Sequence, residues 1–544
     1  MILGVEVLKR FNGNCIRIYK IMNKKKIFPK TAIISQSKKN GLKEFANQIQ
    51  NLGIDIFSTG GTASFLKKNN IKVKSISEIT NFPEILDGRV KTLHPKIHAG
   101  ILANHDNSSH NDTLNKFSIN QIDLIVVNLY PFLEVKNDTK NEDKIIENID
   151  IGGPTLIRAA AKNFKHKIVI VDDNDYTDVL EEISKSGGVS FETRKNLAYK
   201  AFSYVANYDS QISSWLLEKN STEQFPKYFP IPLKIKSDLK YGENPHQKGT
   251  VYTLEGDKKG PLNARIIQGG ALSYNNFLDA DSAFNLVNEF TNPAVSIIKH
   301  SNPCGVSEGD NLVNALINAF NCDPISAFGG IVSFNRKITS KVAKELIKNF
   351  LEVVIAPEIT TKAIEIFKNK PNLKILETGY QKRKEDNEKS LSIKSINGGF
   401  LIQERDEINI SQHELPIVTK KTLTKNLIDD MIFASKVAKY VKSNAIVFAK
   451  NKTSIGIGAG QMSRIDAAKL ASKKAIEIGN YDLKNSVVAS DAFLPFPDTL
   501  EHIHKAGAIA IIQPGGSKKD SEIIELANKL NISMIFSSVR NFNH

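Results

Sequence analysis

The stretch Ser58-Thr59-Gly60-Gly61-Thr62-Ala63-Ser64-Phe65-Leu66 joins a predicted strand to a predicted helix. Residues 54–57 before it are apolar, as in a buried strand, and residues 63–70 after it have helical spacing. A strand, a glycine turn and a helix in this order are typical of α/β folds. The turn presents backbone N–H groups at the positive end of the helix dipole, which can bind phosphate. An ordinary tight turn is an equally good interpretation of this motif taken alone.

Apolar runs on both sides of this stretch extend the same pattern. Residues 30–35, 124–129 and 168–171 are predicted strands, and such continuously apolar strands suit a parallel sheet covered on both faces. A polar and then proline-rich segment follows Trp215 and marks a domain boundary. Further strand-like and helical runs alternate beyond it, without a visible internal repeat. We predict an N-terminal extension at 1–26, a first domain at 27–225, a linker at 226–238 and a second domain at 239–544.

Composition excludes several classes of protein. Among 544 residues, 41% are hydrophobic and 24% charged, which is ordinary for globular proteins and argues against long disorder, collagen or a coiled coil. No apolar run approaches the ~18 residues needed to cross a bilayer. The three cysteines form no CxxC pair, which favours a reducing cytoplasm.

The charge and the first residues leave alternatives open. The net charge of +15 favours phosphate-rich partners and raises nucleic-acid binding as a possibility. Lysine is spread along the whole chain, however, so biased base composition explains the charge more simply. At the N-terminus an apolar stretch precedes Lys9 and Arg10, the reverse of a secretory signal. We therefore expect the extension to be disordered or an over-extended start, with Met22 as a candidate initiator.

The segment Gly88–Pro95 contains two cations, a hydroxyl and an imidazole. Such a set suits a phosphate or a developing oxyanion. His94 and His98 have the spacing of zinc ligands on a helix, but we expect Pro95 to prevent a helix there, and no glutamate follows His94. We therefore predict no metal site.

Two further motifs in the first domain carry proton-transfer groups. Tyr130 follows an apolar strand, where it is either an exposed proton donor or a buried cap on the sheet. Asp150 precedes a glycine pair and a predicted helix, which together offer a second anion site. Arg158 and Lys162 lie one turn apart on that helix, and surface ion pairing is the simple alternative for both.

In the second domain, Lys299 and His300 follow a predicted strand at 295–298. Strand ends in α/β folds are where ligands collect. A lysine beside a histidine supplies an oxyanion stabiliser and a proton acceptor. Cys304 suggests a nucleophile, but a buried structural thiol is more common. Glycine turns at 323–330 and 456–464 are weak signals when taken singly.

Several long strings resemble one enzyme family. The first domain resembles the cyclohydrolase half of the bifunctional phosphoribosylaminoimidazolecarboxamide (AICAR) formyltransferase/IMP cyclohydrolases. The matching strings are "STGGTASFL", "GRVKTLHPKIHAGIL", "VVNLYPF" and "IDIGGPTLIRAAAKN", followed in the family's order by "LKYGENPHQ", "GGALSYNNFLDADSA", "KHSNPCG", "DPISAFGG", "SNAIVFA", "GIGAGQMSRIDAA" and "SDAFLPFPD". The resemblance covers residues 30–544. It implies an α/β protein with an N-terminal methylglyoxal-synthase-like doubly wound domain and a larger α/β transformylase domain with cytidine-deaminase-like subdomains.

The resemblance implies two consecutive reactions. A formyl group passes from 10-formyltetrahydrofolate, a co-substrate, to the amine of AICAR, and formyl-AICAR then loses water to give IMP. His300 is the implied base for transfer and Lys299 the implied transition-state stabiliser. Lys162 is the implied proton donor or acceptor for ring closure, supported by Lys91, Tyr130 and Asp150. The family further implies a cytoplasmic homodimer with transferase sites at the subunit interface, and no metal or prosthetic group.

Binding residues also follow from the resemblance. The ribotide contacts of the transferase are Lys240, Tyr241, His300, Gly329, Glu352, Asn444, Arg464, Phe493 and Arg540. The folate contacts are Ile465, Thr499 and Lys518. The nucleotide contacts of the cyclohydrolase are Ser37, Lys38, Lys39, Thr59, Gly60, Gly61, Thr62, Arg89, Val90, Thr92, Val127, Asn128 and Ile151. Lys240, Glu352 and Lys38 depart from the arginine, aspartate and acidic residue expected there, and a lysine cannot reproduce a bidentate arginine contact.

Two other functions remain as alternatives to this enzyme. A nucleic-acid-binding protein would bind DNA or RNA with a steep salt dependence, but the sequence has no recognised nucleic-acid module. A catalytically inactive nucleotide sensor on the same fold would show no turnover. We expect neither nucleic acid nor membrane as a partner.

Overall fold

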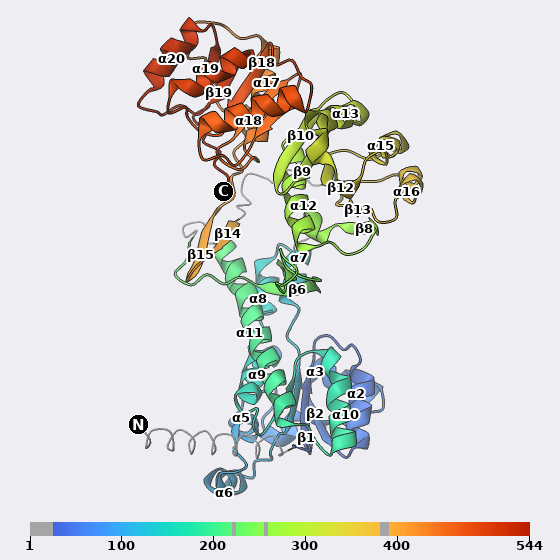
Figure 1. Cartoon of the computed structure of the whole chain (residues 1–544). Coiled ribbons are helices and arrows are strands. Elements are labelled where there is room, and N and C mark those ends of the chain that lie inside the picture. The colour runs from blue at the N-terminus through green and yellow to red at the C-terminus, as the bar shows by residue number, and fades with distance from the viewer. Residues whose placement is uncertain (1–25, 220–224, 255–258, 381–390) are drawn as a thin grey trace, which may run out of the picture. The chain divides into compact units, whose positions relative to one another are not determined.

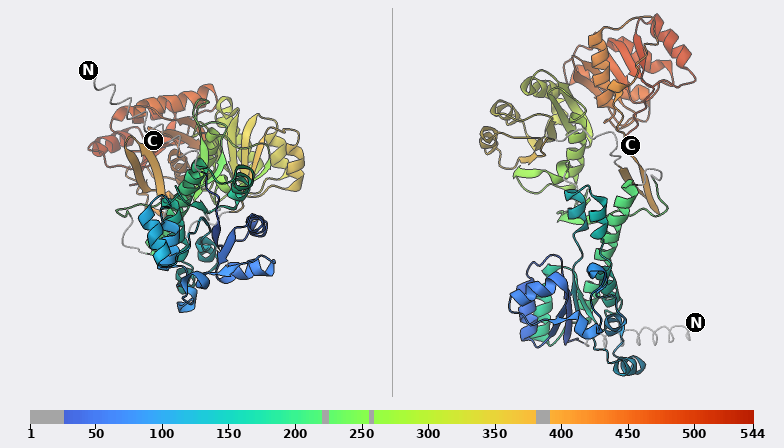
Figure 2. Two further views of the ribbon diagram at one scale, coloured as in Figure 1. Left: turned by 90° about the horizontal axis from the view of Figure 1, so that it is seen from below. Right: turned by 180° about the vertical axis from the view of Figure 1, so that it is seen from behind.

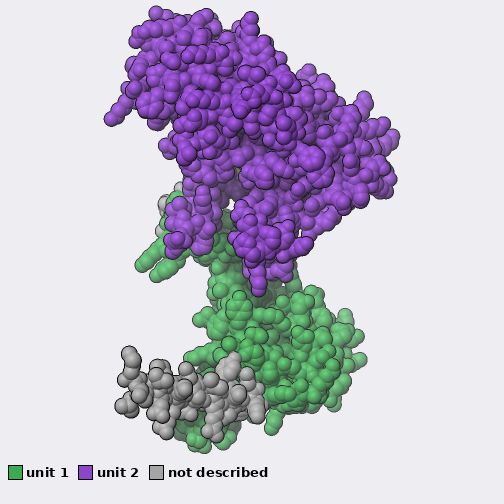
Figure 3. Space-filling view, in the orientation of Figure 1, with its two compact units in different colours: residues 1–234, 254–256 green, residues 235–253, 257–544 purple. Residues whose placement is uncertain are grey.

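The computed structural model describes residues 26–219, 225–254, 259–380 and 391–544. The predicted extension therefore lies outside the described residues, apart from residue 26. The chain divides into two compact units, residues 1–234 with 254–256 and residues 235–253 with 257–544 (Figure 3). The two units meet in sequence within the predicted linker. Among the described residues, no helix combines the length and apolarity needed to span a bilayer.

The first unit is built on a five-stranded sheet with the order β3-β2-β1-β4-β5 (Figure 1). The strands are β1 (Thr31–Ser35), β2 (Asp55–Ser58), β3 (Lys74–Ser75), β4 (Leu124–Val127) and β5 (Ile168–Ile170). All neighbouring strands are parallel, and Ile33 of β1 lies opposite Phe57 of β2 and Ile125 of β4. The predicted parallel sheet is confirmed. Its carboxyl ends share one edge, where ligands bind in such folds.

Helices connect these strands. They are α2 (Leu42–Asn51), α3 (Gly60–Lys68), α4 (Ile76–Thr80), α5 (Pro95–Leu102), α6 (Ser108–Lys116), α7 (Phe132–Asp138), α8 (Glu142–Glu147), α9 (Gly152–Lys162), α10 (Tyr176–Ser186) and α11 (Phe191–Lys219), with 3-10 turns η1 (Leu86–Gly88) and η2 (Asp173–Asp175). α9 packs against both α5 and α11. Leu156, Ile157 and Ala160 of α9 are buried, whereas Arg158 and Lys162 are exposed.

Two helix starts differ from the prediction. α3 begins at Gly60 rather than residue 63, so the two glycines form its first turn and Thr59 is the N-cap. α5 begins at Pro95, so the expectation that Pro95 prevents a helix is wrong. Proline is tolerated at the first helical position because its missing N–H would have no partner within the helix. The ring of His94 caps this helix by accepting the Lys96 N–H at 3.2 Å.

The second unit contains an eleven-stranded sheet with the order β20-β19-β18-β16-β17-β10-β9-β11-β12-β13-β8. Its strands are β8 (Arg265–Gln268), β9 (Ala294–Lys299), β10 (Asn302–Glu308), β11 (Gly330–Phe334), β12 (Leu351–Ala356), β13 (Lys374–Glu377), β16 (Ile446–Lys450), β17 (Thr453–Gly458), β18 (Ser486–Ser490), β19 (Ala508–Gln513) and β20 (Ser533–Phe536). Two separate hairpins are β6 (Leu233–Asp238) with β7 (Thr250–Leu254), and β14 (Leu391–Ile396) with β15 (Gly399–Glu404).

The same helix and strand pattern occurs twice in this unit. Its helices are α12 (Tyr274–Val287), α13 (Leu312–Cys322), α14 (Pro324–Ala327), α15 (Ser340–Leu346), α16 (Thr361–Phe367), α17 (Lys425–Ala438), α18 (Arg464–Glu477), α19 (Pro497–Ala506) and α20 (Asp520–Lys529), with η3 (Pro261–Asn263) and η4 (Ile410–Gln412). In each half a helix precedes an antiparallel hairpin, a second helix, and three parallel strands separated by helices (Figures 1 and 2). The expectation of no internal repeat therefore fails at the level of structure.

The two halves also pack their central helices in the same way. A Cβ atom on Gly305 of β10 would lie 1.8 Å from the carbonyl oxygen of Ala319 in α13. In the other half, a Cβ atom on Gly458 of β17 would lie 1.9 Å from the carbonyl oxygen of Ala467 in α18. Such distances exclude any side chain, so each glycine lets a helix lie directly on the central hairpins. The hairpins meet where β10 pairs with β17.

Candidate active sites

The loops that follow β1, β2 and β4 meet at the carboxyl edge of the first unit's sheet. The Ser37 N–H donates to Oδ1 of Asn128 at 2.6 Å, and Nδ2 of Asn128 donates to the Lys38 carbonyl at 2.8 Å. The hydroxyl of Thr62 bonds both backbone groups of Gln36, accepting at 3.0 Å and donating at 2.8 Å. The structure therefore brings together three segments that the sequence assigned to nucleotide binding.

Two more predicted segments join this edge. Nζ of Lys91 lies 3.8 Å from the position that a Cβ atom on Gly60 would take, beside the first turn of α3. The hydroxyl of Thr92 lies 3.0 Å from the corresponding position on Gly152, at the start of α9. Since both helix starts expose N–H groups, the Lys91 ammonium lies among donors suited to an anion.

Asp150 is held beside the start of α9. Its Oδ1 accepts the Gly153 N–H at 2.8 Å, and its own N–H donates to the Tyr208 hydroxyl at 2.8 Å. Burial raises the pKa of the Asp150 carboxyl, while the N–H groups of Gly153 and Tyr130 and the charge of Lys91 oppose that rise. A carboxyl with a raised pKa beside a lysine can take up or release a proton.

Tyr130 lies at the carboxyl edge of the sheet, whereas Lys162 lies at the far end of α9. The side chain of Tyr130 is 40% exposed at the same edge, so its interpretation as a buried cap is wrong. Lys162 is exposed at the last position of α9. At ~1.5 Å per residue, the helix separates it from Gly152 by about 15 Å. One chain therefore does not bring Lys162 to the Asp150 end of the helix.

Other predicted nucleotide contacts have partners within the unit. Lys38 pairs with Glu134, and Arg89 pairs with Glu147 at an exposed position. Nζ of Lys39 donates to the Ser37 carbonyl at 3.2 Å. Three apolar positions complete the predicted set: Val90, which bridges to Ile85, Val127, which is buried, and Ile151, which is 59% exposed.

In the second unit, His300 and Ser301 form the two-residue turn between β9 and β10. Their φ angles are 51° and 58°, both in the left-handed region that a type I′ hairpin turn requires. Asp279 of α12 holds this turn, because its Oδ1 accepts the Ser301 N–H at 2.6 Å and lies 3.3 Å from the Ser301 hydroxyl. His300 is exposed on the turn. The prediction missed Asp279, although it lies within the string "GGALSYNNFLDADSA".

Lys299 reaches the glycine turn before β11. Its Nζ donates to the carbonyls of Phe328 at 3.1 Å and Gly329 at 2.9 Å. Gly329 has a φ of 68°, and a Cβ atom there would lie 3.1 Å from the lysine Nζ. The rings of Phe328 and Phe350 pack beside it, with centroids 5.0 Å apart. These contacts fix the ammonium group at the end of β9, next to His300.

Arg464 is the centre of a second group of predicted residues. It is 7% exposed, and its guanidinium donates to the Phe493 carbonyl at 3.1 Å and to Oδ1 of Asn444 at 2.8 Å. The buried carboxylate of Asp491 lies 3.2 Å from its Nη2. Burial lowers the pKa of Arg464 and the Asp491 charge opposes this, so the side chain stays cationic. The prediction missed Asp491, in the string "SDAFLPFPD".

A hydrogen bond connects the segment that carries Asn444 to the His300 turn. Oδ1 of Asn302, the first residue after the turn, accepts the Lys442 N–H at 2.9 Å. Lys442 is two residues before Asn444. This hydrogen bond links the His300 turn in the first half of the repeat to the segment before β16 in the second half, which carries Asn444.

α12 links the remaining ribotide positions to the same region. Asn276 donates to the Glu352 carboxylate at 2.8 Å, and Asn275 donates to the carbonyl of Glu243 at 3.3 Å. Glu243 belongs to the loop that carries Lys240 and Tyr241. Asp279 lies about one turn further along the helix. The first turns of α12 therefore contact the 240-loop, Glu352 and the His300 turn.

The positions assigned to folate are less closely grouped. Ile465 follows Arg464 in α18, and Lys518 is exposed shortly before α20. Thr499 in α19 is 1% exposed, with its hydroxyl 3.3 Å from the Asp498 carboxylate. Arg540, a predicted ribotide contact near the C-terminus, is exposed, and its guanidinium carbon lies 4.6 Å from the centroid of the Phe542 ring.

Comparison with known proteins identifies the family. The model of the AICARFT/IMPCHase bienzyme matches residues 160–474, and that of the MGS-like domain matches residues 41–155. The chain belongs to the AICARFT/IMPCHase bienzyme family. This agrees with the resemblance found in the sequence and with an α/β, MGS-like first domain.

Curated relatives in the bienzyme family match over nearly their whole length. The bifunctional purine biosynthesis protein PurH of Caldicellulosiruptor saccharolyticus is 50% identical over 95% of this chain and 100% of its own. The proteins of the same name from a Thermoanaerobacter species and from Aquifex aeolicus are 49% and 46% identical, over 95% and 94% of this chain and all of theirs. The crystal structure of ForH aligns with 34% of this chain and 98% of its own at 32% identity, with a TM-score of 0.31.

The sequence analysis also weighed Cys304 as a nucleophile and His94 as a zinc ligand. Cys304 is buried in β10, and burial raises the pKa of its thiol, which argues against a thiolate nucleophile there. Within the described ranges, no group of three or more histidine, cysteine or carboxylate side chains could hold a metal ion. His94 caps a helix, as described above.

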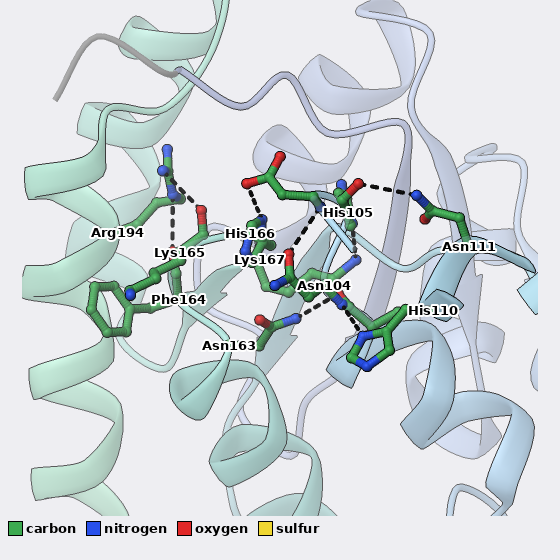
Figure 4. Close-up of polar contacts among 12 residues, drawn as sticks. Asn104, His105, His110, Asn111, Asn163, Phe164, Lys165, His166, Lys167 and Arg194 are labelled. Atoms are coloured by element: carbon green, nitrogen blue, oxygen red, sulfur yellow. Dashed lines mark hydrogen bonds and ion pairs between the residues drawn. The ribbon is translucent and has the colours of Figure 1, made fainter. Parts of the chain in front are cut away.

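A charged cluster lies at the opposite edge of the first unit's sheet, before β4 and β5 (Figure 4). Nζ of Lys167, which is 0% exposed, lies 2.9 Å from Nε2 of His105 and 3.4 Å from the Asp123 carboxylate. Burial and the Lys167 charge lower the pKa of His105 to about 4, and burial lowers the pKa of Lys167 to about 8. His105 therefore accepts a hydrogen bond as a neutral ring.

Proposed function

We propose that this chain catalyses the last two steps of IMP biosynthesis. In the first, AICAR and 10-formyltetrahydrofolate give formyl-AICAR and tetrahydrofolate. In the second, formyl-AICAR gives IMP and water. The match to PurH proteins over their full length carries this proposal, since both halves of the bienzyme are present in this one chain. The grouping of predicted residues at the carboxyl edge of the first unit's sheet, and around the His300 turn and Arg464 in the second unit, supports it.

For formyl transfer, His300 is the proposed base and Lys299 the proposed stabiliser of the oxyanion. The AICAR amine is a poor nucleophile because its lone pair is delocalised into an imidazole that bears a carboxamide. A base on a fixed turn and a positioned formyl donor therefore lower the barrier. Lys299 donates to two carbonyls next to His300, and this fixed position supports its proposed role in stabilising negative charge.

For ring closure, the reacting groups belong to one molecule, so the site has to fold the substrate and move protons. The carboxamide nitrogen attacks the formyl carbon and loses one proton, and the formamide nitrogen loses its proton as the ring C=N bond forms. These two protons leave with the formyl oxygen as water. Lys162 is the proposed proton donor or acceptor, and Asp150, Lys91 and Tyr130 at the carboxyl edge are the proposed supporting groups. The starts of α3 and α9 are the proposed phosphate and oxyanion donors.

The same proposal covers the partners. The molecules bound are AICAR, formyl-AICAR, IMP and the folate co-substrate, and the chain acts as a cytoplasmic homodimer. The anionic substrates account for part of the positive charge. A nucleic-acid-binding role has no comparable support, because the family match covers both units.

A coupled assay tests the function directly. Purified protein supplied with AICAR and 10-formyltetrahydrofolate should form IMP. His300→Ala should abolish transfer while ring closure of supplied formyl-AICAR persists, and Lys162→Ala should do the reverse. Loss of both activities in both folded variants would contradict the two-site assignment, and absence of turnover in the native protein would favour a nucleotide sensor.

A further inference from the structure

Two tyrosines of α11 bind the loops that carry Tyr130 and Asp150. Tyr204 and Tyr208 are four residues apart, so they lie on one face of the helix, about 6 Å apart along its axis. The Tyr204 hydroxyl accepts the N–H of Leu129, which directly precedes Tyr130, at 3.1 Å. The Tyr208 hydroxyl accepts the N–H of Asp150 itself at 2.8 Å. One helix face therefore holds both segments by their backbones.

α11 is a firm support for these hydroxyl groups. It runs over Phe191–Lys219 and packs against α9 and β5. Tyr208 is 4% exposed, and its ring packs edge-on against Phe132 with the centroids 6.3 Å apart. Burial raises the pKa of the Tyr208 hydroxyl to about 12, so it keeps its proton and donates to the Asn148 carbonyl at 3.2 Å. The acceptor for the Asp150 N–H is therefore a hydroxyl on a fixed ring.

The Asp150 carboxylate also links the two segments to each other. It accepts the N–H groups of Gly153 and Tyr130, and the bond from Gly153 is 2.8 Å long. The loop after β4 is thus tied to α11 through Leu129 and to Asp150 through Tyr130. Each N–H that a tyrosine of α11 accepts belongs to a residue proposed for ring closure or to its immediate neighbour.

We propose that Tyr204 and Tyr208 are positioning residues for ring closure, which fix the Tyr130 phenol relative to the Asp150 carboxyl. The inference rests on the proposed roles of Tyr130 and Asp150. Each tyrosine of α11 acts by satisfying a backbone N–H group, because an N–H that loses its acceptor favours a different loop conformation. A shift of about 1 Å in a reacting group can cost roughly 100-fold in rate, so loss of either bond slows ring closure.

Phenylalanine substitutions test the proposal, because they remove each hydroxyl and keep the ring. Tyr208→Phe should lower kcat for ring closure of supplied formyl-AICAR by about 5- to 50-fold, with a much smaller change in KM, because the Asp150 N–H then lacks its acceptor. Tyr204→Phe should lower kcat by about 3- to 10-fold, since its bond to the Leu129 N–H is longer and Tyr204 is only half-buried. Tyr199→Phe, at a 73% exposed position of the same helix, should leave ring closure unchanged.

Double variants separate positioning from a general structural role. Asp150→Asn keeps an acceptor for the Gly153 N–H and should itself slow ring closure. Adding Tyr208→Phe to it should change kcat by less than about twofold, because the carboxyl that Tyr208 positions is already gone. Tyr204→Phe should likewise have little further effect in Tyr130→Phe. Formyl transfer should stay within about twofold of the native rate in every variant, which shows that the chains fold.

The outcomes distinguish this inference from the proposed function. If Asp150→Asn is slow while Tyr208→Phe closes the ring at the native rate, the proposed role of Asp150 stands and positioning by Tyr208 is refuted. Losses that multiply in the double variants would refute it as well, because they indicate a structural role independent of Asp150. If Asp150→Asn and Tyr130→Phe both close the ring at the native rate, the proposed roles of these groups fail and the positioning inference fails with them.

Discussion

Removal of the Asp279 carboxylate should slow formyl transfer without affecting ring closure. Its Oδ1 is the acceptor for the Ser301 N–H at 2.6 Å, in a turn where both residues have positive φ. Without this acceptor the turn loses a hydrogen bond to a charged group, worth ~1.5–3 kcal/mol. If that energy is lost from the conformation that presents His300, kcat falls roughly 10- to 150-fold, at ~1.4 kcal/mol per factor of ten.

The assay compares two activities of one preparation. Asp279→Ala should lower kcat for formyl transfer by this factor and change KM for AICAR much less, because His300 is the proposed base. Asp279→Asn keeps an uncharged acceptor and should lose only about 2- to 10-fold. Ring closure of supplied formyl-AICAR serves as the control for folding. A transfer rate within twofold of native in Asp279→Ala, or an equal loss of both activities, would refute the reasoning.

Three other predictions concern single residues. In Arg464→Lys, the lysine side chain cannot bond Phe493, Asn444 and Asp491 at the same time. We expect the KM for AICAR to rise at least tenfold and the rate of ring closure to stay unchanged. Steady-state kinetics of both reactions would measure these effects. Cys304→Ala should keep both activities within about twofold of the native values. Iodoacetamide should not inactivate the native enzyme, because the Cys304 thiol is buried and protonated. Rapid inactivation would contradict this prediction. His105 has a folded pKa of about 4 against 6.5 unfolded, so the unfolded state binds more protons between these values and the free energy of unfolding decreases as pH falls through that range. Allowing for screening of the partly exposed ring, the free energy of unfolding decreases by roughly 1–2 kcal/mol over this range. Urea unfolding at pH 6.5 and pH 4.5 should show a smaller decrease in this free energy for His105→Gln than for the native chain.

Local sequence patterns predicted the parallel sheet of the first unit and four of its five strands, but missed β3. The apolar runs at residues 30–35, 124–129 and 168–171 contain β1, β4 and β5, because continuously apolar strands of this length are stable only when both faces are covered. Helix starts were less reliable. Pro95 was expected to prevent a helix and instead begins α5, since its effect depends on its position within the helix.

The sequence predicted the residue types of the candidate sites, but not the residues that hold them in position. Asp279 and Asp491 were missed because each acts through a residue distant in sequence, Ser301 and Arg464 respectively. A single sequence carries no signal for such pairs. The repeat in the second unit was not visible in the sequence either, because two segments without visible sequence similarity can form the same order of helices and strands.

By itself, the sequence determined the class of fold, the family and the chemistry available, because glycine turns, apolar periodicity and ordered motifs act over a few residues. Only the tertiary structure decided which of these groups meet. Asp150 and Lys162 are close in sequence yet lie at opposite ends of one rigid helix, whereas Asn302 and Lys442 are far apart in sequence and share a hydrogen bond. Distance along a chain says little about distance in space once helices extend by ~1.5 Å per residue and hairpins pair across a sheet.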